Sequence, residues 1–275
     1  KLIGPLFGGI FGSDPAQMPV RYSLEGLLAA EKRAGSLLLA GLSRLRNRER
    51  PPAASFDEGL QRLPEALYAV TAYRVRLETP ATRIRSAGAG YVIETAAGSE
   101  RVDRVVVTTP APVAADLLAG VAEGADGLAA LRYNPLVMVH LAADLDRAGM
   151  GYQVCRDEPL ETLGVTWNAS LFGRDNIYTG FLGGMWNPDL IDESDERLGT
   201  TAASEFEAVT GAPARPIRVT RHERGFPAHD ESWRALDDLA LPDGMHLATN
   251  YTGRLGVGGR VREARRLAES FAAEA

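Results

Sequence analysis

A glycine-rich segment near the end of the sequence, Gly256-Val257-Gly258-Gly259, constrains the fold more strongly than any other feature. An apolar run that predicts a strand precedes it, at residues 245–248, and a run that predicts a helix follows, at residues 261–271. Glycine lets backbone approach a ligand closely, and the first N–H groups of a helix favour negative charge. The segment therefore predicts an anion-binding corner between a strand and a helix.

This corner cannot form a complete dinucleotide site by itself. A self-contained dinucleotide fold needs a further strand and an acidic residue about twenty residues beyond the glycines. The sequence ends at Ala275, and it begins at Lys1 rather than at a methionine. We therefore expect a fragment of a longer protein, in which the corner completes a cofactor site held mainly elsewhere.

Composition narrows the class of protein. With 275 residues, 45% hydrophobic and 24% charged, the chain is typical of a globular protein of one large or two ordinary domains. A net charge of −6 argues against a nucleic-acid partner. The single cysteine, Cys155, excludes an internal disulfide or a cysteine zinc cluster and favours a reducing, cytoplasmic location.

Periodicity predicts an alternation of helical and strand-rich segments. Leucines recur at helical spacing in residues 24–45, a stretch that could also lie on a membrane surface as a peripheral contact. A short helix is expected through Leu63 and Leu67. Residues 74–107 read as several strands, the first at residues 74–77, with a hairpin turn at residues 88–90. Residues 133–184 read as a second strand-rich block. Residues 192–209 predict a helix with an acidic start.

The usual catalytic constellations are missing from the sequence. The four histidines show no pair at metal-ligand spacing, so we expect no metal site, and no serine lies in a Gly-x-Ser-x-Gly elbow. Clustered carboxylates fit surface helix and loop ends better than an acid/base pair. The sequence offers instead glycine-rich backbone and apolar side chains, which are the expected lining of a site where a bound cofactor carries the chemistry. We name no catalytic base.

Several segments of the sequence match one known family in the order of that family. The first is Gly8-Gly9-Ile10-Phe11-Gly12-Ser13-Asp14-Pro15. The others are at residues 55–63, 81–84, 105–111, 133–135, 149–155, 225–229 and 250–269. On these segments the chain resembles the later part of the oxygen-dependent protoporphyrinogen/coproporphyrinogen oxidases, which are FAD-dependent members of the flavin amine oxidase superfamily. The family's N-terminal Gly-x-Gly-x-x-Gly unit is absent from these residues, so we expect the chain alone to be inactive.

The resemblance implies an α+β or α/β fold, part of an FAD-dependent oxidoreductase. It implies a helical lobe with a pocket segment at residues 1–54 and an FAD-domain segment of strands and helix at residues 55–127. A mixed-sheet substrate domain would follow at residues 128–240, with the C-terminal FAD-domain strand and helix at residues 241–275.

The resemblance also assigns site residues. It implies FAD contacts from the backbone of Ala81, at the adenine, and from Leu255, Gly256 and Val257, at the flavin. For the substrate it implies Gly9, Met150 and Gln153. The chain departs from the family pattern here, since Met150 replaces an aromatic residue and Gln153 a leucine, so the pocket could be reshaped and more polar.

The implied activity is transfer of hydride equivalents from a porphyrinogen to FAD, with O2 as the final acceptor, in haem biosynthesis. One alternative is another flavin oxidase or desaturase of the same fold, acting on an amine or a polyene. Another is a non-enzymatic module that holds a porphyrin or a protein partner. Oligomeric state and the choice between protoporphyrinogen and coproporphyrinogen are not readable from the sequence.

Overall fold

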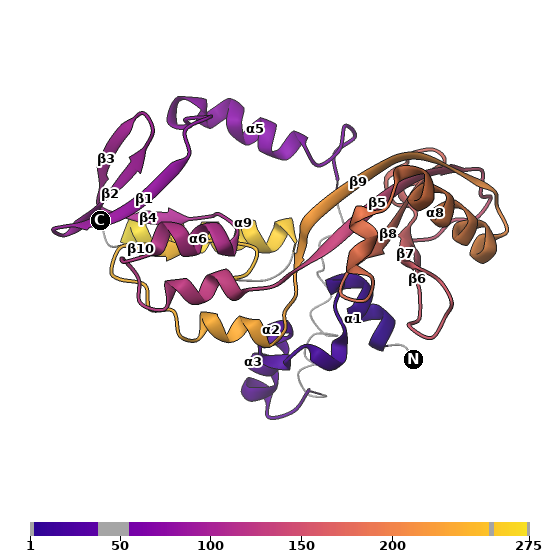
Figure 1. Ribbon diagram of the computed structural model, residues 1–275, viewed down its shortest axis with the longest axis horizontal. Helices are drawn as coiled ribbons and strands as arrows, with labels where there is room; N and C mark the ends of the chain where they lie inside the picture. The colour runs from indigo at the N-terminus through magenta and orange to yellow at the C-terminus, as the bar shows by residue number, and fades with distance from the viewer. Residues whose placement is uncertain (1–2, 38–54, 253–255, 274–275) are drawn as a thin grey trace. The chain divides into compact units, whose positions relative to one another are not determined.

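The computed structural model describes residues 3–37, 55–252 and 256–273. The chain forms two compact units (Figure 1). The first unit combines Lys1–Val70 with Arg132–Glu231, and the second combines Thr71–Leu131 with Ser232–Ala275. Each unit contains both helices and sheet, so the expected mixture of α and β structure is confirmed.

A five-stranded sheet forms the centre of the first unit, in the order β6-β7-β8-β5-β9. The strands are β5 (Tyr133–Ala143), β6 (Gly151–Gln153), β7 (Thr162–Thr166), β8 (Ile177–Gly183) and β9 (Ala214–Pro227). All four neighbouring pairs are antiparallel, so the prediction of a mixed sheet is wrong in this detail. The reason is that β8 and β9, which run in the same direction, lie on opposite sides of β5 and do not pair.

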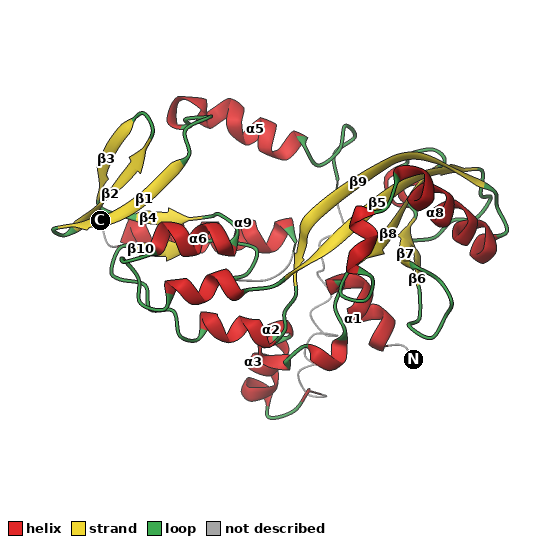
Figure 2. Cartoon of the chain, viewed as in Figure 1, coloured by secondary structure: helices red, strands yellow, loops and turns green. Residues whose placement is uncertain are grey.

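Alternation along β5 places its odd-numbered apolar side chains on one face of the sheet, where helix α8 (Asp195–Thr210) covers them (Figure 2). Ser194 caps this helix by accepting a hydrogen bond from Arg197 N at 3.2 Å. Acidic residues occupy its first turn as the sequence predicts, and Gly211 ends it with φ +79°.

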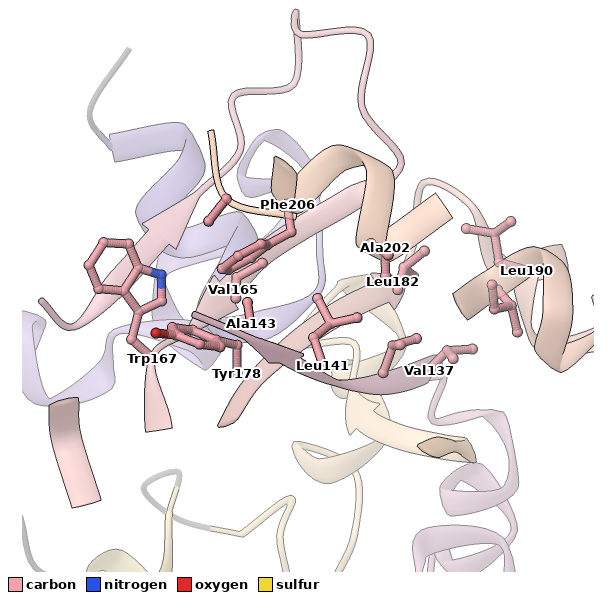
Figure 3. Close-up of a cluster of buried hydrophobic side chains, with 14 residues drawn as sticks. Val137, Leu141, Ala143, Val165, Trp167, Tyr178, Leu182, Leu190, Ala202 and Phe206 are labelled. Carbon is pink, nitrogen blue, oxygen red and sulfur yellow. The ribbon is translucent and has the colours of Figure 1, made fainter. Parts of the chain in front are cut away.

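The buried core between sheet and helix contains large aromatic side chains (Figure 3). Phe206 of α8 is completely buried, and its ring centroid lies 4.9 Å from that of Tyr178 on β8. Trp167 extends the cluster with an edge contact to Tyr178 at 6.3 Å. Burial of this apolar area is the main stabilising term for the first unit.

The N-terminal part of the first unit is helical. It contains α1 (Ile3–Phe11), α2 (Val20–Ser23), α3 (Glu25–Ala34) and α5 (Arg62–Thr71). The short helix expected through Leu63 and Leu67 corresponds to α5. The helix predicted in the leucine-rich residues 24–45 is present as α3 as far as Ala34, and residues 38–54 lie outside the described part of the chain.

The second unit contains an antiparallel meander and a two-stranded parallel sheet. Its elements are β1 (Ala81–Ala87), β2 (Gly90–Thr95), β3 (Gly98–Val102), β4 (Val105–Val107), α6 (Ala111–Leu118), β10 (Met245–Leu247) and α9 (Val257–Ala273). Gly88, with φ +66°, makes the predicted hairpin turn between β1 and β2. The strand predicted at residues 74–77 is wrong, because this segment pairs with no described strand and Val75 and Leu77 are exposed.

Within the described residues, we find no helix that combines the length and the apolar character required to span a bilayer.

Candidate functional site

A cavity of about 430 Å³ opens in the first unit between α1 and the loop that joins β6 to β7. Its lining is glycine and apolar side chains with a few charged groups. The residues that line it are Gly4, Pro5, Gly8, Gly9, Asp14, Pro15, Ala16, Val154, Cys155, Arg156, Asp157, Leu160, Glu161, Thr162, Leu163, Trp186 and Asn187. This size and composition are typical of a small-molecule site.

Helix α1 forms one wall, and its glycines allow the opposite wall to come close. A Cβ atom on Gly8 would lie 2.6 Å from Cη2 of Trp186, and a Cβ on Gly9 would lie 2.7 Å from Nε2 of Gln153. Such distances are well inside van der Waals contact. Glycine at these two positions is therefore required for the cavity to keep its present shape.

Exchange of Gly8 for alanine should be destabilising, although alanine normally favours a helix. The Trp186 indole would have to move out of the way, and overpacking of this kind costs about 1–3 kcal/mol of unfolding free energy. Gly4→Ala is the matched control, because it lies on the same helix and a Cβ there has no atom within 4 Å. Urea unfolding should show a lower midpoint for Gly8→Ala and an unchanged or raised one for Gly4→Ala. Equal midpoints would contradict the packing argument.

A buried polar cluster holds the segment that follows α1. Asn134 on β5 donates from Nδ2 to Gly12 O at 2.9 Å and to Ser13 Oγ at 2.6 Å. Ser13 Oγ in turn donates to Ala228 O at 2.8 Å, and Ser13 is completely buried. Buried polar groups satisfied in this way specify a single backbone path. The cluster therefore fixes the path of the chain from the end of α1 to Asp14, which lies at the edge of the cavity.

Nearby, His229 lies at the end of β9 in the left-handed backbone region, with φ +55°, and its ring contacts that of Phe11. Burial lowers the pKa of its imidazole, opposed by the Pro227 carbonyl and by Asp230. At neutral pH the ring is therefore uncharged, and its Nδ1 lies 2.8 Å from Pro227 O. We assign it to the support of the α1 segment.

The opposite wall is held by charged groups of α8. Glu205 accepts the backbone N–H of Glu161 at 2.7 Å and that of Thr162 at 2.9 Å. Arg197 forms a bidentate pair with Glu161, with both N–O distances at 2.9 Å. Two hydrogen bonds in this fork geometry fix orientation as well as charge. The Glu161 carboxylate is therefore neutralised locally by the protein itself.

Tyr152 on β6 packs against the core beside this wall. Its pKa is raised, mainly by burial and further by the charge of Glu205. The phenol is therefore protonated throughout the physiological range and does not serve as a base.

The structure brings two of the three predicted substrate residues together. Gly9 lines the cavity, and Gln153 lies directly against Gly9. Met150 does not join them, because it precedes β6 with 77% of its surface exposed, held by the hydrogen bond from Trp167 N to its carbonyl.

Sequence reasoning missed Arg156 and Trp186, which face each other at the cavity. The guanidinium carbon of Arg156 lies 5.5 Å from the centroid of the Trp186 ring. The two residues are thirty positions apart on different loops and match no motif, so only the fold brings them together. A tryptophan two residues after the Gly183-Gly184 pair, where β8 ends in a turn, was the available signal.

The glycine corner belongs to the second unit. Strands β4 and β10 are parallel, so their carboxyl ends lie at one edge of the sheet, and the chain continues from β10 through the loop to α9. Ligands of α/β sheets bind at such edges. The loop is anchored by Ala248 N, which donates to Val107 O at 3.0 Å, and by Tyr251 Oη, which donates to Thr109 O at 3.3 Å.

Gly256 immediately precedes α9, with φ +84° and no atom within 4 Å of the position a Cβ would take. Its carbonyl accepts Gly259 N at 3.0 Å and Arg260 N at 3.2 Å, which closes the first turn of the helix. Gly256, Val257 and Gly258 are all exposed. The corner thus offers open space and helix N-terminal N–H groups, as the sequence predicts, and it fits a ligand with an electron-rich edge.

The remaining predicted cofactor contacts are less defined. Ala81 is the first residue of β1 and is exposed, next to an irregularity in the pairing with β2. The adenine contact at Ala81 stays a prediction. Leu255 lies outside the described residues. Among the residues that the structure does describe, no three His, Cys, Asp or Glu side chains gather where they could hold a metal.

Comparison with known proteins identifies the family. The model of the flavin containing amine oxidoreductases matches residues 2–274. The chain therefore belongs to this family, and the predicted flavin oxidoreductase fold is confirmed. Flavin is the cofactor class that membership implies.

Several relatives carry a more specific name. The chloroplastic protoporphyrinogen oxidase of Oryza sativa subsp. japonica is 24% identical over 94% of this chain and 57% of its own length. That of Spinacia oleracea is 26% identical over 94% of this chain and 54% of its own. The chain thus spans little more than half of these curated relatives.

Solved structures agree on the fold. A candidate protoporphyrinogen oxidase from Exiguobacterium sp. 255-15 is 28% identical, with a TM-score of 0.74 over 99% of this chain and 63% of that one. A variant of putrescine oxidase is 14% identical, with a TM-score of 0.61 over 79% of this chain and 53% of that one. The second likeness shows the fold alone.

Proposed function

We propose that this chain is part of an FAD-dependent oxidase that converts a porphyrinogen, protoporphyrinogen IX or coproporphyrinogen III, to the porphyrin with O2 as acceptor. The observation that carries the proposal is the cavity in which the Gly8–Gly9 pair meets Trp186, with Gln153 directly against Gly9. Its support from relatives is that curated proteins named protoporphyrinogen oxidase match nearly the whole of this chain.

In this proposal the protein supplies geometry rather than proton transfer. The cavity wall of α1 and the Trp186 face give an apolar surface against which a flat tetrapyrrole can lie. Gln153 adds a side-chain amide where the family pattern has an apolar residue, so it can bond a pyrrole N–H through its oxygen. The tight approach of Gly9 keeps that amide in place.

For the cofactor, Gly256 and Val257, with Leu255, are the residues that would hold the flavin end of FAD, and the Ala81 backbone the adenine end. When bound, FAD accepts the hydride equivalents removed from the substrate. The first N–H groups of α9 and the helix dipole would stabilise negative charge at this corner.

The test is steady-state O2 consumption by the flavin-loaded, full-length protein. We expect turnover with protoporphyrinogen IX or coproporphyrinogen III and none with a primary amine or a polyene. Turnover with an amine or a polyene alone would replace the proposal by the second class of flavin oxidase. No turnover with any of them, in a protein that retains flavin, would reject the porphyrinogen assignment.

A further inference from the structure

The cavity of the first unit is lined by a cation, Arg156, which forms no ion pair with any of the described residues. Its guanidinium lies over the Trp186 ring. By contrast, Arg197 is engaged in a bidentate pair with Glu161. Arg156 is therefore available to a ligand.

Its geometry suits an anionic ligand. A guanidinium that lies over an aromatic ring keeps its N–H groups at the edge, where they can donate two parallel hydrogen bonds to a carboxylate. Trp186 is in turn fixed by its close contact with Gly8. The guanidinium of Arg156 is thus positioned by its contact with the Trp186 ring, unlike that of a free surface arginine.

The remaining charges of the cavity limit how many anions it accepts. Glu161 is neutralised by Arg197, while Asp14 directs one carboxylate oxygen to the backbone N–H of Ala16 at 3.0 Å. Asp14 and Asp157 share the lining with Arg156, and their negative charge disfavours a second anionic group. Arg156, the cation among these acidic residues, therefore favours a ligand that places one carboxylate beside it.

We propose that Arg156 is a specificity-determining residue, which binds a single carboxylate of the substrate and orients that end of the molecule in the cavity. The inference rests on the proposed function, because the porphyrinogen is the molecule that supplies the carboxylate, on the propionate side chains of an apolar macrocycle. It goes beyond that function by naming the residue, Arg156, and the substrate group that Arg156 binds. No bond forms or breaks in this step.

The experiment compares a dicarboxylate with its neutral ester. Binding of protoporphyrin IX and of its dimethyl ester to the flavin-loaded, full-length protein is measured by quenching of tryptophan fluorescence, to which Trp186 contributes. The variants are Arg156→Gln and Arg156→Lys. Arg215→Gln is the control, because Arg215 is exposed on β9 and does not line the cavity.

We expect wild type to bind the dicarboxylate more tightly than the ester. Arg156→Gln should weaken dicarboxylate binding about tenfold or more and leave ester binding unchanged, since hydrogen bonds to charged groups carry energies of that size. Arg156→Lys should lie between the two, because it keeps the charge and loses the fork. Arg215→Gln should behave as wild type.

Two kinds of failure are distinguishable. If wild type binds porphyrins but Arg156→Gln weakens both ligands equally, or neither, the assignment of Arg156 is overturned while the proposed function stands. If wild type binds neither ligand and oxidises no porphyrinogen, the proposed function fails and this inference fails with it.

Discussion

We expect Gly256→Val to abolish stable flavin binding. A β-branched side chain here fills the open space in front of α9, where we propose that the flavin lies. The steric cost of φ +84°, about 1–2 kcal/mol, is present with and without flavin, so it lowers stability rather than affinity. The ratio of flavin to protein after gel filtration, read from the visible absorbance, should fall at least about tenfold.

Gly120→Val separates the flavin contact from backbone strain. Gly120 belongs to the same unit, has φ +76° and likewise has no atom within 4 Å of a Cβ position. It follows α6 and is not part of the corner. We expect Gly120→Val to lose stability and to keep its flavin. Equal flavin loss in both variants would mean that strain alone, rather than a contact at the corner, explains the result.

Phe206→Ala should destabilise the first unit by about 3–5 kcal/mol, because it empties a completely buried aromatic site against Tyr178. Helix α8 also carries Glu205 and Arg197, which hold the cavity wall at Glu161 and Thr162. Loosening α8 should therefore weaken ligand binding as well as stability. Urea unfolding followed by tryptophan fluorescence measures the first effect, since Trp167 lies in the same core.

Phe172→Ala is the control for this substitution. Phe172 ends α7 (Asn168–Phe172) in the same unit, with 40% of its surface exposed. Removal of a side chain that is partly in water costs less, and the unfolding free energy should fall by about 1 kcal/mol or less. A loss as large as that of Phe206→Ala would contradict the assignment of the core to the α8 face of the sheet.

Local sequence pattern predicted most elements of the fold. The strand-rich character of residues 133–184, the glycine turn at Gly88 and the acidic start of α8 each depend on neighbours in the chain, and each is found. The exposed apolar segment at residues 74–77 misled the prediction, because a strand also requires a partner strand. The antiparallel order of the large sheet depends on which strand β9 pairs with, and no local pattern states that.

In the candidate site, too, some residues could be predicted from local sequence pattern and others could not. Gly256 and Gly9 stand out in the sequence because glycines cluster around them. A strand and a helix flank the corner as predicted, but α9 begins at Val257, so Gly258 and Gly259 lie in the helix rather than in the turn before it. Arg156, Thr162 and Trp186 have no such signal, since their importance comes from lining one cavity together. Met150 was named by the resemblance and is mostly exposed, so its substrate contact stays a prediction.

The most direct test of the central claim is anaerobic mixing of the flavin-loaded, full-length protein with porphyrinogen, followed by the visible absorbance of the flavin. We expect the flavin to be bleached by protoporphyrinogen IX or coproporphyrinogen III, and admission of O2 to restore the colour. A flavin that stays oxidised with both porphyrinogens would contradict the proposed porphyrinogen oxidase activity.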